Sequence, residues 1–112
     1  MPAATAMLIA TTTLPTRREA DALAATAIAQ NLAVCAQVEG PLQSHYVWEG
    51  RPTVSEEWRV TYKLLPETAG PLSACVHAAH PYTAPQWLVV KVEHTGEKYL
   101  SWARQARSSV NF

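Results

Sequence analysis

The sequence predicts an α+β fold in which four strands and two helices follow the order β-α-β-β-α-β, with a third helix at the end. Two observations predict this fold class. Two long segments with period-two alternation meet near Gly50 and form one antiparallel ribbon over residues 33–64. Two amphipathic helical segments, 16–31 and 71–79, each stand between runs of strand-forming residues. This order is that of the split βαβ, or ferredoxin-like, sandwich.

Length and composition bound the class of protein. The 112 residues are expected to form one domain, 1–112, with 48% hydrophobic residues and nine basic against nine acidic side chains. There is no basic excess to attract nucleic acid, and no apolar run of about 18 residues to span a membrane. The first six residues lack both the basic and the apolar part of a secretory signal, so a cytoplasmic location is expected.

The first strand and the first helix are predicted over 6–13 and 16–31. The run 6–13 is apolar and β-branched, which is typical of a buried strand. Thr16 and Glu19 make a capping-box pattern, in which each side chain accepts a hydrogen bond from an amide of the first turn. The helix that follows is expected to bury one face, made of Ala20, Leu23, Ala24, Ala27 and Ile28.

The ribbon is predicted to reach beyond one subunit. A bulge or an edge position is expected at Gly40-Pro41, because proline cannot donate to the ladder. Arms of a dozen or more residues reach about 40 Å at roughly 3.3 Å per residue, which is more than a domain of this size covers. Part of the ribbon is therefore expected to pair with another subunit. On the return arm, two faces alternate, namely Trp58, Val60, Tyr62 and Leu64 against Glu57, Arg59, Thr61 and Lys63.

The second half of the chain is predicted to add a helix, a strand and a last helix. Pro71 fits a first helical turn, and His80-Pro81 ends that helix because a residue before proline leaves helical geometry. The run 87–92 is the fourth strand. The last helix is expected from Thr95 or Gly96 to about Arg107. The expected buried faces of the two helices are Leu72, Cys75, Val76 and Ala79 in the first, and Tyr99, Trp102, Ala103 and Ala106 in the second.

Candidate metal ligands are scattered along the chain. Only His77 and His80 lie as close as three residues apart. Cysteine and histidine together would suit copper or zinc. On spacing alone, structural roles are favoured: Cys35 and Cys75 as buried, reduced thiols and the histidines as surface or capping groups. Cys35 as a nucleophile is less favoured, because nothing in the sequence places a base beside it. Four glycines provide no phosphate-binding loop.

Aromatic residues are dense in the chain, and two interpretations of them stay open. They could line half of a binding pocket, with Glu57, Lys63 and His80 as its polar groups. They could equally form the core and a subunit interface, where Trp and Tyr are common anchors. The set is Tyr46, Trp48, Trp58, Tyr62, Tyr82, Trp87, Tyr99 and Trp102.

Several short blocks together resemble one known family. They are Leu32-Ala33-Val34-Cys35-Ala36, Ser44-His45-Tyr46-Val47-Trp48-Glu49-Gly50, Glu57 with Lys63, His80-Pro81-Tyr82 with Pro85, and Tyr99-Leu100-Ser101-Trp102. In this order they resemble CutA, the divalent-cation-tolerance protein family, over nearly the whole chain. The resemblance implies a ferredoxin-like subunit in a homotrimer whose ribbons pair between subunits, with a trimer shape close to that of PII signalling proteins.

The resemblance also implies where a site would lie. In this family the clefts between subunits are lined by the positions that match Cys35, Tyr46, Trp48, Glu57, Lys63, His80, Tyr82 and Trp102. Members proposed to bind copper carry a cysteine where this chain has Thr12, and a His-His pair where it has Ala79-His80. Two further departures are Gln86, at a position that is usually acidic, and Arg51, at a position that is usually lysine.

These expectations define two functions from different classes. The first is a trimeric, non-enzymatic protein of divalent-cation tolerance that responds to metal ions. It would bind copper, zinc or another divalent ion, with His80 as first and Cys35 as second ligand, in a cleft shaped by Tyr46, Trp48, Glu57, Lys63, Tyr82 and Trp102. The second is a PII-like trimeric signalling or scaffold protein that binds a small ligand or a protein partner without metal. A hydrolase of the acylphosphatase type on the same fold is the least supported, because no phosphate cradle is evident.

Overall fold

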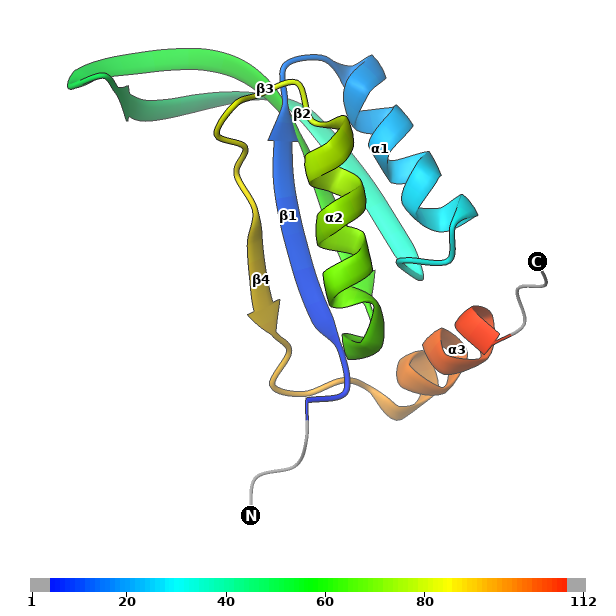
Figure 1. Ribbon diagram of the computed structural model, residues 1–112. Helices are drawn as coiled ribbons and strands as arrows, with labels where there is room; N and C mark the ends of the chain where they lie inside the picture. The colour runs from blue at the N-terminus through cyan, green and yellow to red at the C-terminus, as the bar shows by residue number, and fades with distance from the viewer. Residues whose placement is uncertain (1–4, 109–112) are drawn as a thin grey trace.

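A computed structural model describes residues 5–108 of the chain, and it has the predicted element order (Figure 1). Residues 1–4 and 109–112 of the predicted domain lie outside the described residues, as does most of the segment in which a secretory signal was sought. A short 3-10 turn, Pro66–Thr68, precedes the second helix. The elements are β1 (Leu8–Leu14), α1 (Arg17–Ala29), β2 (Cys35–Trp48), β3 (Arg51–Leu64), α2 (Ala69–Ala79), β4 (Leu88–Lys91) and α3 (Glu97–Ser108).

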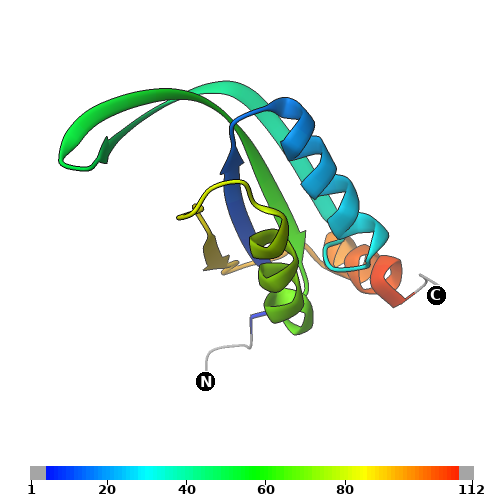
Figure 2. The same cartoon turned by 45° about the horizontal axis from the view of Figure 1, so that its top comes forward.

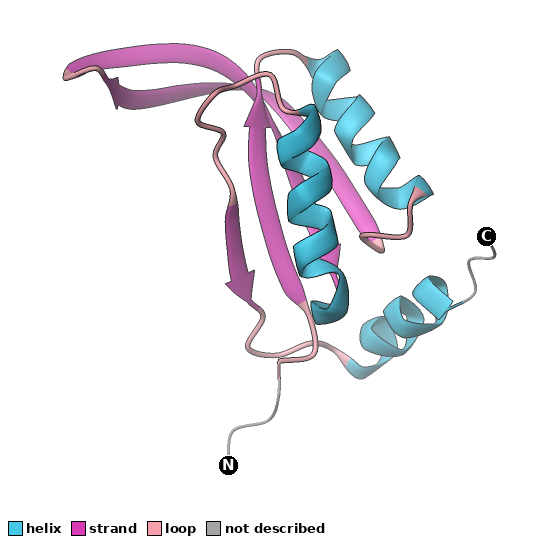
Figure 3. Cartoon of the chain, viewed as in Figure 1, coloured by secondary structure: helices cyan, strands magenta, loops and turns pink. Residues whose placement is uncertain are grey.

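The four strands form one antiparallel sheet in the order β2-β3-β1-β4. Helices α1 and α2 lie side by side on one face of it (Figure 3). Between the sheet and these helices lies the main core, in which Ala10, Leu14, Val60, Tyr62, Leu64, Leu72 and Val76 are at most 1% exposed. A smaller cluster of Met7, Leu65 and Ala103 attaches α3 to the strands. The mixed α+β fold with a four-stranded antiparallel sheet and three helices is therefore confirmed.

The start of α1 shows half of the predicted capping box. The amide of Glu19 donates to the hydroxyl of Thr16 at 3.2 Å, as expected. The Oε2 atom of Glu19 is buried and has no hydrogen-bond partner within residues 5–108, so the reciprocal bond is not made through it. The predicted buried face is right at four positions and wrong at Ile28, which is 44% exposed. Ile28 lies at the margin of the apolar stripe and in the last turn of α1, where less of the sheet remains to cover it.

The ribbon is confirmed as a continuous hairpin of two 14-residue strands. Glu49 and Gly50 have φ values of 51° and 75°, the left-handed geometry that a two-residue hairpin turn requires. The predicted irregularity is found between Glu39 and Leu42. There the ring of Trp58 comes so close to Gly40 that a Cβ on Gly40 would lie 2.6 Å from it. The bulge therefore depends on glycine for close packing.

The half of the ribbon beyond the bulge extends away from the body of the subunit (Figure 2). Its apolar side chains are exposed, with Val47 at 71%, Val54 at 54% and Trp48 at 52%. β4 is similar, because Leu88, Val89 and Val90 are 43–56% exposed. These residues are apolar surface without cover in one subunit.

The two later helices depart from the predicted faces. In α2, Leu72 and Val76 are buried, Cys75 is partly exposed and Ala79 is exposed. In α3, Ala103 is buried as predicted and Leu100 packs beside it, while Tyr99 and Trp102 are 39% and 46% exposed. The prediction for Tyr99 and Trp102 is wrong for one subunit, because the stripe that meets the strands runs through Leu100 and Ala103. Within residues 5–108, no helix combines the length and the apolar composition needed to cross a membrane.

Candidate functional site

His80 ends α2 and is held by three hydrogen-bonding groups. Its Nε2 lies 3.0 Å from the carbonyl oxygen of Thr13 and 3.0 Å from the hydroxyl oxygen of Thr12. Its Nδ1 accepts from the amide of Tyr82 at 3.2 Å. Because a carbonyl can only accept and an amide can only donate, Nε2 carries the proton and Nδ1 supplies the lone pair. The ring is therefore neutral, with both nitrogens engaged.

The local sequence explains this position. Pro81 prevents α2 from continuing, and His80 takes extended geometry at the C-cap with φ −74° and ψ 133°. The chain then turns over the end of β1, where the ring meets the last strand residues. Burial lowers the pKa of the imidazole, and His77 lowers it further, while the Thr13 carbonyl and the carboxylates of Glu19 and Glu57 act to raise it. The dominant effect, loss of solvent, keeps the ring neutral.

Tyr82 connects His80 to the return arm of the ribbon. Its hydroxyl donates to Oε2 of Glu57 at 2.9 Å, and its ring centroid lies 5.1 Å from that of His80. Glu57 is only 9% exposed, although the alternation predicted it on the face opposite the core residues. Burial and the bond to Glu57 both raise the pKa of the Tyr82 phenol, so it stays protonated and donates. Thr12, Thr13, Glu57, His80 and Tyr82 are hereafter the His80 cluster.

The other predicted site residues lie in three places. Tyr46 and Trp48 lie on the outer half of the ribbon, where the hydroxyls of Tyr46 and Ser55 are 2.7 Å apart. Cys35 and Lys63 are opposite each other where the ribbon enters the sheet. Trp102 lies on α3 against Tyr99, with ring centroids 5.4 Å apart. The structure brings Glu57, His80 and Tyr82 together, and Tyr46 lies close enough to Tyr82 to help raise the pKa of its phenol. It shows no hydrogen bond or ring contact that joins Trp48, Cys35, Lys63 or Trp102 to these residues within residues 5–108.

The two predicted metal ligands lie in different parts of the subunit. Cys35 pairs with Lys63, which pairs with Ile9, while His80 contacts Thr12 and Thr13. Cys35 and His80 are therefore separated by three or four residues along the strand direction and by two strands across the sheet, which is roughly 10 Å in each of these directions. In the part of the chain that the structure describes, no group of three or more His, Cys, Asp and Glu side chains could hold a metal ion. Both cysteines are free thiols, as predicted, but the prediction that they are buried is wrong, since each is partly exposed.

Sequence reasoning missed two members of this neighbourhood. Thr12 was singled out only as a departure from the family pattern and Glu19 only as a helix cap, yet Thr12 bonds to His80 and Glu19 acts electrostatically on both His80 and Tyr82. A signal existed for Thr12, since it occupies the position at which copper-binding relatives are expected to carry cysteine. For Glu19 there was none, because nothing in the sequence indicates that the capping carboxylate faces the His80 loop.

The comparison with known families is decisive for the class of protein. The family model of the CutA1 divalent ion tolerance protein matches residues 8–106. The chain belongs to the CutA1 family. A divalent-cation tolerance protein CutA from Escherichia coli K12 is 35% identical over 98 residues, which cover 88% of each chain.

Solved CutA structures have the same fold. CutA from Synechococcus elongatus is 29% identical with a TM-score of 0.86, over 93% of this chain and 92% of that one. A protein from Archaeoglobus fulgidus described as a periplasmic divalent cation tolerance protein CutA is 25% identical with a TM-score of 0.85, over 90% and 98% of the two chains. The family resemblance drawn from the sequence blocks is confirmed.

Within the CutA family, this chain differs at the positions that the resemblance links to copper. Thr12 stands where a cysteine is expected, and its hydroxyl meets His80 at 3.0 Å. Ala79, where a second histidine is expected, is an exposed helix-end residue without a ligating atom. Thr12 and His80 are therefore in contact, and they present a hydroxyl and an imidazole whose two nitrogens are both engaged. A soft metal ion prefers thiolate to a hydroxyl oxygen.

Proposed function

We propose that this CutA family member works as a cytoplasmic homotrimer in divalent-cation tolerance, without enzymatic turnover, and that a divalent ion such as copper or zinc binds in the clefts between subunits. The observation that carries the proposal is the uncovered apolar surface of the outer ribbon and β4. Val47 at 71% and Leu88 at 56% exposure are examples. Patches of this kind mark surfaces that associate. A ribbon paired with its neighbours would cover them.

The position of the candidate ligands supports a site between subunits. Cys35 and His80 are both partly exposed, and they are too far apart in one subunit to share an ion. Only neighbouring subunits could place the thiol of one near the imidazole of another. Tyr46, Trp48 and Trp102 are exposed aromatic groups that would line such a cleft. Lys63, Glu57 and Tyr82 would supply its polar wall.

Metal binding at His80 would break one of the hydrogen bonds that the ring makes. A metal on Nδ1 would displace the amide of Tyr82, and a metal on Nε2 would displace the ring proton that bonds to Thr13. Because ligation needs a free lone pair, one of these bonds must break first. We therefore expect weak binding that depends on His80 leaving the His80 cluster.

The test is a copper(II) titration of the full chain and two matched double variants. We expect Cys35→Ser with His80→Ala to lose copper binding, and Cys75→Ser with His77→Ala to keep it, since the control pair removes the same residue types. Unchanged binding by the first variant would contradict the proposed ligands.

The same geometry favours a second function, a PII-like trimeric scaffold or signalling protein without metal. The specific observation is that both nitrogens of His80 are already engaged. In that case the wild-type chain assembles into trimers and takes up no stoichiometric copper or zinc. The clefts would then hold a small ligand or a protein partner.

A further inference from the structure

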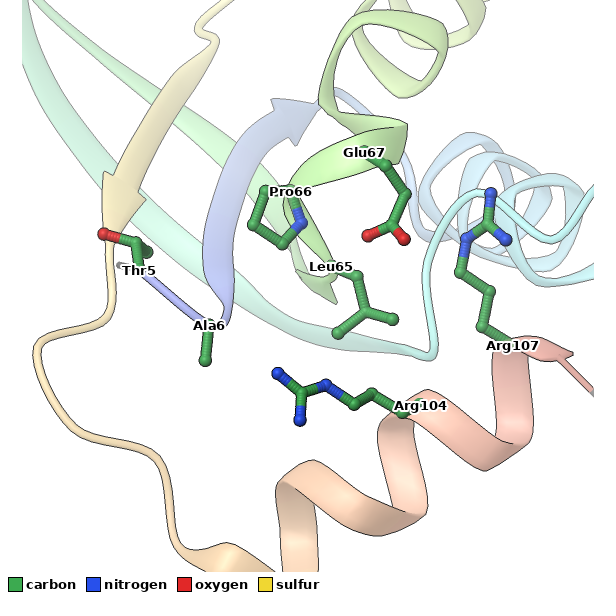
Figure 4. A pocket seen from close by; sticks show the side chains of 7 residues that line it. All are labelled: Thr5, Ala6, Leu65, Pro66, Glu67, Arg104 and Arg107. Atoms are coloured by element: carbon green, nitrogen blue, oxygen red, sulfur yellow. The ribbon is translucent and has the colours of Figure 1, made fainter. Parts of the chain in front are cut away.

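A pocket lies outside the His80 cluster, among residues to which the sequence analysis gave no binding role. It measures about 320 Å³ and is formed where α3, the turn after β3 and the segment before β1 come together. Figure 4 shows Glu67 projecting into it from above, Arg104 and Arg107 bordering it from α3, and Leu65 between them. None of these side chains belongs to the His80 cluster or to the predicted cleft. The volume is at the small end of the range for metabolite sites.

The charges of this pocket are not paired with one another. Within residues 5–108 the ion pairs are Arg17 with Asp21 and Arg59 with Glu39, and neither includes a residue of the pocket. Two guanidinium groups and one carboxylate thus line the same space without an ion-pair contact between them. The wall between them is apolar, formed by Ala6, Leu65 and Pro66.

Arg107 provides the strongest sign of a missing partner. Its Nε atom is buried and has no hydrogen-bond partner in the described part of the chain. Its backbone carbonyl accepts from Nδ2 of Asn31 at 3.0 Å, so the end of α3 is tied to the end of α1. A buried donor without a partner is unfavourable, and guanidinium groups pair best with the two oxygens of a carboxylate.

We propose that this pocket binds a small zwitterionic metabolite of the α-amino acid class with an apolar side chain. Its carboxylate bonds to Arg104 and, once the Arg107 side chain turns toward Arg104, to Arg107 as well, because the two guanidinium groups point in different directions in Figure 4. Its ammonium group bonds to Glu67, and its side chain lies against Leu65 and Pro66. A simple anion would satisfy the arginines and leave Glu67 facing negative charge. A zwitterion satisfies both signs, which is the reason to prefer it.

The test uses L-leucine and two analogues that each lack one of its charged groups, titrated into the full chain by isothermal calorimetry. L-Leucine carries both charges, leucinamide lacks the carboxylate, and 4-methylpentanoate lacks the ammonium group. We expect L-leucine to bind at least about 10-fold more tightly than either analogue, since each loses a charge-assisted bond. Inorganic phosphate is the fourth probe, and it is expected to bind more weakly than L-leucine.

Three variants and one control assign the contacts. Arg104→Gln and Arg107→Gln should each lower the affinity for L-leucine by about 10-fold or more. Glu67→Gln should lower the affinity for L-leucine and leave the affinity for 4-methylpentanoate unchanged. The control Arg18→Gln changes an exposed arginine of α1 and should change neither affinity. A thermal melt checks that each variant folds. If Arg107→Gln does not fold, Arg104→Gln and Glu67→Gln still test the proposal, because both change exposed positions.

Three results would overturn the proposal. The first is no binding of L-leucine at millimolar concentration. The second is binding of phosphate or 4-methylpentanoate as tight as that of L-leucine, which would make the pocket a plain anion site. The third is L-leucine affinity that is unchanged in both arginine variants. The readout requires neither metal nor trimer, so its failure is distinct from a failure of the proposed function.

Discussion

The two halves of the ribbon have the same alternating pattern and opposite environments. In the inner half, Val60, Tyr62 and Leu64 are 0–1% exposed beneath α1 and α2. In the outer half, Val47 and Val54 are 71% and 54% exposed. The alternation thus predicts that a face is apolar, but not what covers it. The helices α1 and α2 cover the inner half, whereas the outer half is uncovered in a single chain, and our proposal is that neighbouring subunits cover it.

The largest expected effect is on assembly and comes from a charge in the outer half. Val47→Asp should convert the proposed trimer to folded monomers, because an unpaired carboxylate buried at an interface costs on the order of 3–5 kcal/mol. Sedimentation velocity measures the mass, and far-UV circular dichroism measures the fold. Gln43→Asp, at an exposed polar position of the same arm, is the control and should stay trimeric. A trimeric Val47→Asp protein would place the interface elsewhere.

On the helix α2 that covers the inner half, a truncation should act on folding itself. Leu72→Ala removes a fully buried side chain and should lower the free energy of unfolding by about 2–5 kcal/mol. Urea denaturation at a fixed protein concentration measures the change. Ile28→Ala is the matched control, and at 44% exposure it should cost only about 0.5 kcal/mol. Equal costs at the two positions would contradict the assignment of the core.

His80 lies where the two halves meet, and its contribution to the free energy of unfolding should depend on pH. Burial holds the pKa of its folded-state imidazole below the ordinary value of 6.5. As pH falls through about 6.5, the unfolded chain binds the proton first, so the stability gained from the neutral ring is present above that pH and is lost below it. Urea denaturation of the wild type and His80→Ala between about pH 8 and pH 5 checks this. The stability difference between them should shrink as pH falls, and a constant or growing difference would oppose the neutral-ring assignment.

The smallest expected effect concerns a single core hydroxyl. The Tyr62 hydroxyl is buried and has no hydrogen-bond partner within the described residues, and burial raises the pKa of its phenol. Tyr62→Phe should therefore leave the free energy of unfolding unchanged or raise it by up to about 1 kcal/mol. Thermal denaturation of the two proteins at equal concentration measures this. A clear loss of stability would indicate that the hydroxyl is bonded in solution, for instance by water.

Much of the fold could be predicted because its signals are local. The capping threonine Thr16, the turn at Gly50 and the helix stop before Pro81 each act within a few residues of their own position. The element order then allows few topologies. The errors occur where a buried stripe depends on a distant neighbour. Tyr99 and Trp102 follow the helical period as well as Leu100 and Ala103 do, and only the placement of α3 against Met7 and Leu65 decides between them.

The candidate site could be predicted only in part, for the same physical reason. Its bonds join residues far apart in the chain, since Thr12 and His80 are 68 positions apart and Glu57 and Tyr82 are 25 positions apart. The family resemblance indicated which residues matter and did not indicate how they bond. That both nitrogens of His80 are engaged follows from hydrogen-bond geometry alone, and no spacing pattern contains that information.

The most direct test of the account is native mass spectrometry of the full chain, with and without copper(II) or zinc(II), at near-neutral pH. The account predicts a mass three times the 12.3 kDa of one chain, with added metal in multiples of three. A trimer that takes up no metal would favour the scaffold function. A monomer would contradict the central claim, that the exposed half of the ribbon is covered by neighbouring subunits.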